Sequence, residues 1–289
     1  MHRLVIPLSI VALLAGCALL DTPRRGTTGS ILRDRPRDMA IPAALDSLRV
    51  VSWNIQYSQR IDTALEEIEA IPHLKGADVY LLQEIDTEAA ARLVRTTGLA
   101  GAHYSASVRT RSGRELGNLV LSRWPIVGAR RVDLPHGGGL RGAPRSATVV
   151  DLKIAATRVR VVSIHTSIAI VSPDERIDQA RTALMALGDF AGPTVIAGDF
   201  NTVERGDDLA LRALLRDYDF DWVFPGTDTT VDTMWKEVLL PHDRLDHVFV
   251  RGFAVRSAGV VPDTDASDHL PQWVVMAWPP RIDAEGALR

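Results

Sequence analysis

The sequence predicts a layered α/β domain, and two features of the chain carry that prediction. Strands over 48–55 and 79–84 flank an amphipathic helix over 61–74, and such a strand–helix–strand unit brings both strand ends to one edge of a sheet. Two runs rich in β-branched residues, 147–154 and 159–164, are separated by a short link and predict an antiparallel hairpin. Because 46% of the 289 residues are hydrophobic, the chain has enough apolar material for a large core.

Residues 1–16 predict a signal peptide that precedes a lipid anchor. The apolar run from Leu4 to Leu14 is too short to span a bilayer. It ends at Leu14-Ala15-Gly16-Cys17, and Cys17 is the only cysteine of the chain. This stretch resembles a bacterial lipoprotein signal, which implies cleavage before Cys17 and a lipid on its sulfur. Ala18 follows rather than an aspartate, so the resemblance favours the periplasmic face of the outer membrane. An ordinary signal peptide and a buried thiol are the alternatives.

Residues 17–46 predict a flexible tether between this anchor and a domain over 47–289. The segment is rich in Arg, Pro and Gly and shows no apolar periodicity before Ile41. Its arginines either touch anionic head groups or only keep the linker soluble, and we favour the second. With no second cysteine, the exported domain has no internal disulfide and must be stable by its core. The net charge of −3 gives no bulk attraction to nucleic acid.

The middle of the chain predicts a strand, a long loop and a helix. The strand covers 117–122, and the loop covers 135–145, with Arg141 and Arg145 in it. The loop is not a Walker loop, because it lacks the Gly-Lys-Ser/Thr ending. Its arginines either steer an anionic substrate or belong to a plain connector. Ser172-Pro173-Asp174-Glu175 then predicts a helix start, with Ser as the N-cap, Pro at the first helical position and a capping box.

The stretch Gly198-Asp199-Phe200-Asn201 ends a buried strand over 193–197. Since side chains alternate along an extended strand end, Asp199 and Asn201 point to one side and Phe200 points into packing. The same four residues also form an ordinary strand-to-turn sequence. The elements that follow are a helix over 207–216, a strand over 244–250 and a final strand over 273–278.

Polar residues stand at the margins of these apolar runs, and they would form one shared site if the strand ends converge. Carboxylate and amide oxygens suit a hard divalent cation, Mg²⁺ or Mn²⁺. Such an ion neutralises charge on a phosphoryl oxygen, a carboxylate deprotonates water, and a His paired with an Asp protonates or stabilises oxygens. The set fits metal-assisted phosphoester hydrolysis, whereas acyl transfer fits poorly because the chain has no Gly-x-Ser-x-Gly elbow. The residues are Asn54, Glu84, His165, Asp199, Asn201, Asp246, Asp268 and His269.

An ordered series of short motifs makes this prediction specific. In chain order the motifs are Ser52-Trp53-Asn54, Leu82-Gln83-Glu84, Gly117-Asn118 to Arg123-Trp124-Pro125, Ser163-Ile164-His165-Thr166, Gly198-Asp199-Phe200-Asn201, Leu245-Asp246-His247-Val248-Phe249-Val250 and Ser267-Asp268-His269-Leu270-Pro271. The series resembles the endonuclease/exonuclease/phosphatase superfamily over about residues 47–279. That resemblance implies the DNase I-like fold, a four-layer α-β-β-α sandwich of two packed, mostly antiparallel sheets flanked by helices.

The resemblance also implies a metal side of the site. Glu84 is expected as the principal Mg²⁺ ligand, with Asn54 beside it and Asp268 as a further carboxylate. Gln56 stands where several DNA-repair members carry Asp, which puts a second metal interaction in doubt.

The resemblance further implies the catalytic side. Asp199 is expected to position or activate water, while Asn201 and His165 act on the phosphate oxygens. His269, oriented by Asp246, is expected at the scissile phosphate.

We therefore expect a monomeric, membrane-anchored, Mg²⁺-dependent phosphodiesterase or phosphatase of the cell envelope. A lipid head group or a small phosphoester is the favoured substrate, because the chain shows no aromatic–basic ladder for single strands. The alternatives are a DNase-type endonuclease, and a non-catalytic envelope binding module with the same fold.

Overall fold

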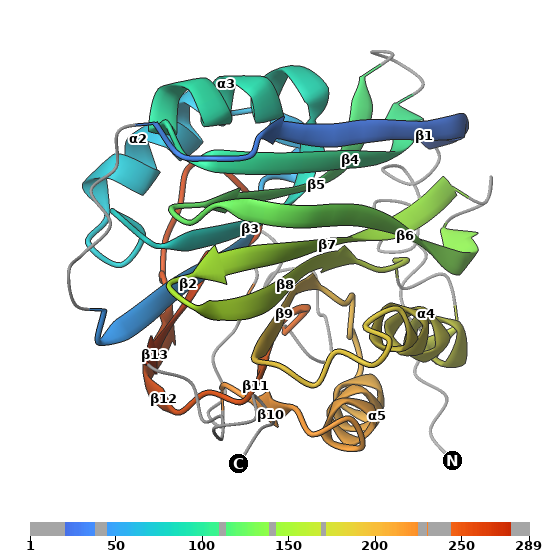
Figure 1. Ribbon diagram of the computed structural model, residues 1–289. Helices are drawn as coiled ribbons and strands as arrows, with labels where there is room; N and C mark the ends of the chain where they lie inside the picture. Colours follow the sequence, from blue (N-terminus) through green and yellow to red (C-terminus); the bar gives the residue numbers. More distant parts are fainter. Residues whose placement is uncertain are drawn as a thin grey trace.

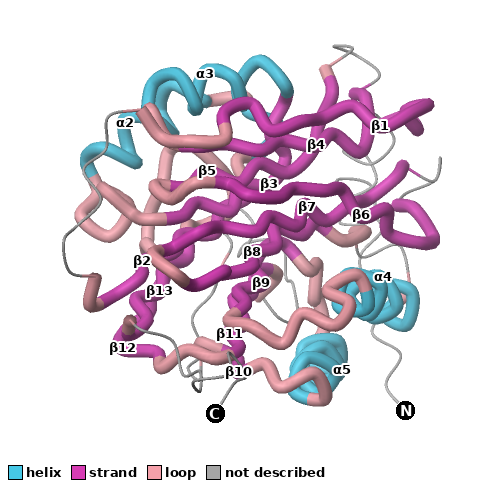
Figure 2. Tube along the Cα trace, viewed as in Figure 1, coloured by secondary structure: helices cyan, strands magenta, loops and turns pink. Residues whose placement is uncertain are grey.

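The structure is a computed structural model that describes residues 21–37, 45–109, 114–138, 143–168, 172–224, 230 and 244–278. Its strands form two sheets packed face to face, and helices lie on the outer faces (Figures 1 and 2). The strands are β1 (Asp21–Arg33), β2 (Ser47–Asn54), β3 (Val79–Asp86), β4 (Ala100–Arg109), β5 (Glu115–Ser122), β6 (Ile126–Gly138), β7 (Ala143–Ile154), β8 (Thr157–His165), β9 (Thr194–Asp199), β10 (Asp221–Trp222), β11 (Asp246–Arg251), β12 (Val255–Val260) and β13 (Gln272–Ala277). The helices are the 3-10 turn η1 (Gln56–Ser58), α2 (Ile61–Ala70), α3 (Thr87–Thr97), α4 (Pro173–Met185) and α5 (Arg205–Arg216).

Three apolar layers hold the sandwich together. The seven-stranded sheet has the order β1-β4-β5-β3-β2-β13-β12, and the six-stranded sheet has the order β10-β11-β9-β8-β7-β6. One buried cluster fills the space between the sheets and includes Leu81 and Val161. A second cluster lies under α2 and α3, and a third under α4 and α5. The expected four-layer α-β-β-α sandwich is confirmed.

Each sheet contains one pair of parallel neighbours, while its other described pairs are antiparallel. The parallel pairs are β2 with β3, joined through α2, and β8 with β9, joined through α4. The carboxyl ends of two parallel strands meet at the same edge of a sheet. Each sheet therefore delivers two strand ends to one edge, and the packing of the sheets brings these edges together.

Most of the elements expected from the sequence are present. The hairpin over 147–154 and 159–164 is the antiparallel pair β7 and β8. Helix α4 begins at the expected capping box, in which the Ser172 hydroxyl accepts from the Glu175 N–H and the Glu175 carboxylate accepts from the Ser172 N–H. Helix α2 ends at Ala70, four residues before the expected end at residue 74, because the chain turns extended at Ile71 ahead of Pro72.

Residues 21–33, expected within the flexible tether over 17–46, instead form strand β1. This strand pairs antiparallel with β4 and so covers what would otherwise be the edge of the larger sheet. The register is interrupted twice, which explains why the stretch shows no clean alternation of apolar residues. Cys17, the expected lipid attachment site, lies outside the described residues.

The expected loop over 135–145 is also partly wrong. Residues 135–138 belong to β6 and residues 143–145 belong to β7, while 139–142, with Arg141, lie outside the described residues. Helix α3 was not anticipated, although Asp86 caps it by accepting from the Ala89 N–H and Gly98 ends it in the left-handed conformation.

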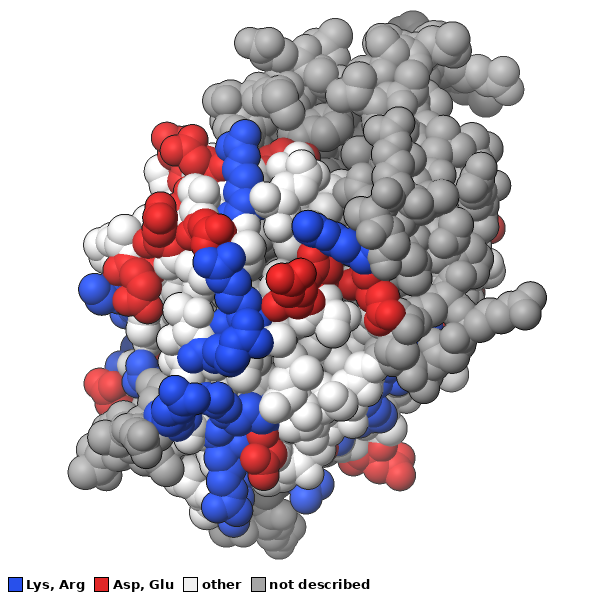
Figure 3. All heavy atoms as spheres, turned by 90° about the horizontal axis from the view of Figure 1, so that it is seen from above, with Lys and Arg blue, Asp and Glu red and all other residues white. Residues whose placement is uncertain are grey.

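One face of the molecule, seen from above the view of Figure 1, carries both positive and negative side chains among its described residues (Figure 3). There the basic side chains form a narrow band, and clusters of acidic side chains lie beside it (Figure 3). Among the helices that the structure describes, none is both long and apolar enough to cross a membrane.

One buried histidine makes the fold sensitive to acid. Nε2 of His103 on β4 lies 2.9 Å from the Ile85 carbonyl, so this nitrogen must carry a proton and donate. Burial lowers the pKa of His103 below its usual 6.5, against the weaker opposing effects of the Ile85 hydrogen bond and the Asp86 charge. Below pH 6.5 the unfolded chain therefore takes up a proton that the folded chain excludes, and stability is lost as the pH falls.

We predict that His103→Gln will flatten this pH dependence, because the amide still donates to Ile85 but cannot take up a proton. Between about pH 7.5 and about pH 5.5, the unfolding free energy of the wild type should fall relative to the variant, by at most about 1.4 kcal/mol per pH unit. Urea denaturation across this range measures the difference. Parallel pH profiles for the two proteins would contradict the prediction.

Candidate active site

Four strand ends converge at one edge of the sandwich. Asn54 and Glu84 come from β2 and β3, and His165 and Asp199 come from β8 and β9. The Asn54 Nδ2 donates to Asp199 Oδ2 at 3.1 Å, which joins the two sheets directly. The His165 Nε2 lies 3.5 Å from Asp199 Oδ2 and 3.9 Å from Glu84 Oε1. The structure thus brings together residues that are 145 positions apart.

Asp199 reaches this edge because β9 can approach β8 very closely. Gly198 has a φ of +149°, and a Cβ there would lie 1.9 Å from the Ile164 carbonyl oxygen, so only glycine fits. As expected, Phe200 packs under α4 and α5. Asn201 is buried next to Asp199, but in a turn beyond the end of β9 rather than on the expected extended strand end. The Asn201 N–H donates to Asp199 Oδ1 at 2.9 Å, and Asn201 has a left-handed φ of 52°.

Glu84 faces the site because β3 carries a bulge. Gln83 points between the sheets, where its amide donates to Ser163 Oγ at 2.9 Å, so regular alternation would turn Glu84 toward the helices. The register with β5 shifts between Leu82 and Ile85, and Glu84 adopts a φ of 57°. The Tyr57 N–H then donates to Glu84 Oε2 at 3.0 Å. Tyr57 also has a positive φ, and this contact, made by the backbone, was not foreseen from the sequence.

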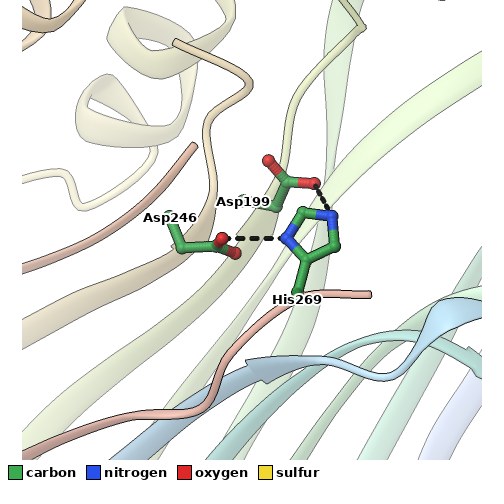
Figure 4. Close-up of side chains that lie close together, drawn as sticks. All are labelled: Asp199, Asp246 and His269. Carbon is green, nitrogen blue, oxygen red and sulfur yellow. Dashed lines mark hydrogen bonds and ion pairs between the residues drawn. The ribbon is translucent and has the colours of Figure 1, made fainter. Parts of the chain in front are cut away.

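His269 lies between two carboxylates (Figure 4). Its Nδ1 is 2.8 Å from Asp246 Oδ2, and its Nε2 is 3.8 Å from Asp199 Oδ2. The backbone around it is fixed, because the Ser267 hydroxyl donates to the Asn54 carbonyl and accepts from the His269 N–H. The carboxylates and imidazole also lie within 4.8 Å of one another. Because Nδ1 is already engaged by Asp246, we interpret them as a hydrogen-bonded triad rather than a metal cage.

Burial and neighbouring charges shift the pKa values of His269 and Asp199. Burial alone would lower the pKa of His269, but the carboxylates of Asp246 and Asp199 outweigh it and raise this pKa well above 6.5. Burial raises the pKa of Asp199 to about 6, helped by the charge of Asp246 and opposed by His269 and the Asn201 N–H. At neutral pH the pair is therefore an imidazolium beside a carboxylate with a raised proton affinity.

The side of the site that was expected to bind a metal holds excess negative charge. Burial and the charge of Asp268 raise the pKa of Glu84 to about 7, against the lowering effects of Arg145 and His269. The pKa of His165 is lowered by burial and by Arg145 and His269, so this imidazole is neutral at neutral pH. The oxygens of Glu84, Asn54 and Asp268 match the donors that Mg²⁺ prefers, and a divalent cation would offset their repulsion. The side chains present therefore fit the expected ion.

A small cleft with a volume of about 20 Å³ lies beside Glu84 and His165. Arg145 on β7 lines it, while Arg141 lies outside the described residues. The residues lining the cleft are Tyr57, Glu84, Ala106, Leu116, Gly117, Asn118, Pro144, Arg145, Ser146 and His165. Asp246 and His269 do not line it. The cleft thus extends from the part of the site that holds Glu84 and His165.

The fold and the polar edge define a hydrolase-like α/β sandwich, and comparison with known proteins gives its family. Residues 51–269 match the model of the Endonuclease/Exonuclease/phosphatase family. The chain belongs to this family, whose name covers enzymes that hydrolyse phosphoester bonds. A UPF0294 protein of Vibrio vulnificus strain CMCP6 is 28% identical over 81% of this chain and 78% of its own length. A UPF0294 protein of Vibrio parahaemolyticus is 30% identical, but that match spans only 44% of this chain and 43% of the relative.

Solved structures share the fold. An endonuclease/exonuclease/phosphatase from Beutenbergia cavernae superposes with a TM-score of 0.64 at 24% identity, over 81% of this chain and 72% of that one. Sphingomyelinase C from Streptomyces griseocarneus gives 0.58 at 22% identity, over 81% and 99% of the two chains. A mannosyl-6-phosphatase from Bacteroides thetaiotaomicron gives 0.60 at 16% identity, over 78% and 98%. At these identities the similarity is one of fold.

We predict that Glu84→Gln will stabilise the metal-free protein. Because the pKa of Glu84 is raised from 4.5 to about 7, the folded chain keeps a proton that the unfolded chain has released, and stability falls as the pH rises from about 4.5 to about 7. In a chelator at about pH 8, the variant should exceed the wild type in unfolding free energy by on the order of 1–3 kcal/mol, and the gain should shrink toward about pH 6. Added Mg²⁺ should raise the Tm of the wild type only. If Mg²⁺ also raises the Tm of the variant, Glu84 is not the principal Mg²⁺ ligand.

Proposed function

We propose that this protein is a Mg²⁺-dependent phosphoester hydrolase of the cell envelope. The observation that carries the proposal is the position of His269 between Asp246 and Asp199, at the edge where Glu84 and Asn54 also end. A non-catalytic binding module would not need an imidazolium held next to a carboxylate of raised pKa at a polar strand edge.

The proposed reaction is attack of water on phosphorus, which forms a new P–O bond and breaks the bond to the ester oxygen. The departing oxygen leaves as an alcohol after it takes up a proton from solvent. Asp199, with a pKa of about 6, is ionised at neutral pH and accepts the proton of the attacking water. His269, held as an imidazolium by Asp246, donates to a phosphoryl oxygen as charge builds there. Asn201 and the neutral His165 contact the remaining phosphate oxygens. Glu84, with Asn54 and Asp268, would hold Mg²⁺, which when bound would neutralise phosphoryl charge as a Lewis acid.

The cleft favours an ester with a small or weakly charged group over a nucleic acid strand. Beyond the site its walls are formed by Ala106, Leu116, Pro144 and Tyr57, and its cationic side chain is Arg145. A strand of nucleic acid needs several cations along its path. Arg145 would bind the phosphate, and the apolar wall would receive the esterified group. A lipid head group or a small phosphoester is therefore the proposed substrate. We propose that the enzyme acts as a monomer.

We also propose that the domain is lipid-anchored at the periplasmic face of the outer membrane. Support comes from the Leu14-Ala15-Gly16-Cys17 stretch and from Ala18 after it. A single acyl chain binds a membrane only marginally, so stable attachment requires more than one acyl chain at the N-terminus of the mature lipoprotein.

We predict that Asp199→Ala and His269→Ala will each lower kcat by about 10² or more, since each removes a proton-transfer or charge-stabilising group. The soluble domain, begun at residue 21 so that β1 is kept, should be screened with Mg²⁺ against sphingomyelin, phosphoinositides, aryl phosphodiesters and supercoiled DNA. Nicking of DNA that the Asp199 variant loses would favour the DNase-type alternative. A wild type inert toward all four would favour the binding module.

The control for these variants is Asp78→Ala. Asp78 is a buried carboxylate too, but it lies just before the amino end of β3, paired with Arg123 at the edge opposite Glu84. Its loss should lower stability and leave turnover per folded molecule unchanged. Near-normal turnover in either site variant would contradict the assigned roles.

We predict that Cys17→Ser will release the protein from membranes without changing turnover in vitro, because the lipid would have no sulfur to join. Fractionation of cells that express the full chain, followed by assay of the soluble and membrane fractions, measures this. A variant that stays with the membrane would count against the anchor.

A further inference from the structure

The residue after Asp246 faces the opposite side of β11 and is fully buried. His247 has no exposed surface, and its ring packs edge-on against Phe200 and stacks on Phe249 under α4 and α5. Its Nε2 lies 2.7 Å from the hydroxyl of Thr202, and its Nδ1 lies 3.9 Å from Asp208 Oδ1. An imidazole is seldom buried among apolar rings unless its polar atoms are used.

The direction of the hydrogen bond to Thr202 follows from the proton count. The Thr202 hydroxyl is also 2.7 Å from the Arg244 carbonyl oxygen, which can only accept. A hydroxyl has one proton, so it donates to Arg244 and must accept from His247. The Nε2 of His247 therefore carries a proton. The result is a short relay from His247 to Thr202 to the backbone that leads into β11.

Thr202 is the residue directly after Asn201, where the chain needs support. Asn201 has a φ of 52°, a left-handed conformation that residues other than glycine, Asn included, adopt only where local contacts hold it. On one side, its N–H is held by Asp199 at 2.9 Å, while its own amide reaches the Thr166 carbonyl at a long 3.3 Å. On the other side, the relay fastens Thr202 to the strand that pairs with β9, in which His247 lies opposite Gly198.

We propose that Thr202 and His247 are positioning residues that hold Asn201 in the orientation in which it contacts the phosphate. This inference rests on the proposed function for the role of Asn201. The two neighbours on β11 then serve the site from both faces of the strand: Asp246 orients His269 on the face toward the other sheet, and His247 secures the Asn201 turn on the face toward α4 and α5.

The test compares isosteric variants of two threonines. Thr202→Val removes the hydroxyl and keeps the shape, whereas Thr202→Ser keeps the hydroxyl. Thr194→Val is the matched control, because Thr194 is also buried, lies at the other end of β9, donates to the Gly192 carbonyl at 2.9 Å and accepts from Arg251 at 3.4 Å. Both valine variants should lower the Tm by similar amounts.

Only Thr202→Val should lower kcat/KM, by about 10-fold or more, since a small misplacement of a contacting group has effects of this size. Thr202→Ser should stay within about 3-fold of the wild type because it keeps the hydroxyl. His247→Gln, whose amide places a donor near the Nε2 position, should retain more activity than His247→Leu. Equal kcat/KM for the two valine variants would overturn the inference and leave the proposed function standing.

Two readouts do not depend on turnover. Inorganic phosphate with Mg²⁺ should raise the Tm of the wild type and of Thr194→Val, and should raise that of Thr202→Val much less. NMR spectra of ¹⁵N-labelled histidine side chains should show that Nε2 of His247 carries a proton. A wild type that hydrolyses no phosphoester would defeat the proposed function, and these readouts then decide the inference. Equal phosphate shifts in both valine variants, no shift in the wild type, or an Nε2 without a proton would each overturn it.

Discussion

The structure depends on the burial of several carboxylates at one edge of two packed sheets. Glu84, Asp199 and Asp246 come from three different strands, and burial together with neighbouring negative charge raises the pKa values of Glu84 and Asp199. Within the described part of the chain, the positive charges that oppose these shifts belong to His269 and Arg145. With a single cysteine in the chain, the apolar clusters between and outside the sheets must offset the cost. The same unbalanced charge suits the edge to a divalent cation and to an anionic substrate.

Periodicity and local signals predicted much of this site. A strand–helix–strand unit with parallel strands places both carboxyl ends at the same edge, so Asn54 and Glu84 could be expected together from the sequence alone. The capping box of α4 and the hairpin of β7 and β8 are equally local features. The meeting of the two sheets is not local. Nothing in the spacing of Asn54 and Asp199 predicts their 3.1 Å contact, and that expectation came only from the resemblance to a family.

The features that the sequence did not predict depend on tertiary pairing. Alternation along β3 would point Glu84 toward α2 and α3, and only the shifted register against β5 turns it to the site. The hydrogen bond from the Tyr57 N–H to Glu84 could not be predicted from the sequence, because every residue except proline has a backbone N–H. Strand β1 exists because β4 offers it an edge, and its own residues read as a polar linker. These errors share one cause: each conformation is imposed by a partner distant in the chain.

The backbone is least regular where the proposed chemistry is placed. Glu84, Tyr57 and Asn201 all have positive φ, and each such residue costs on the order of 1 kcal/mol or more. Hydrogen bonds to neighbouring elements hold these conformations: Tyr57 to Glu84, Asn201 to Asp199, and the hydroxyl of Thr202 to the chain that enters β11. A regular strand end would avoid this cost, but it would direct alternate side chains to opposite faces. Side chains from several strands can point at one phosphate only if this alternation is interrupted. The strained residues are therefore the ones that direct side chains into the site.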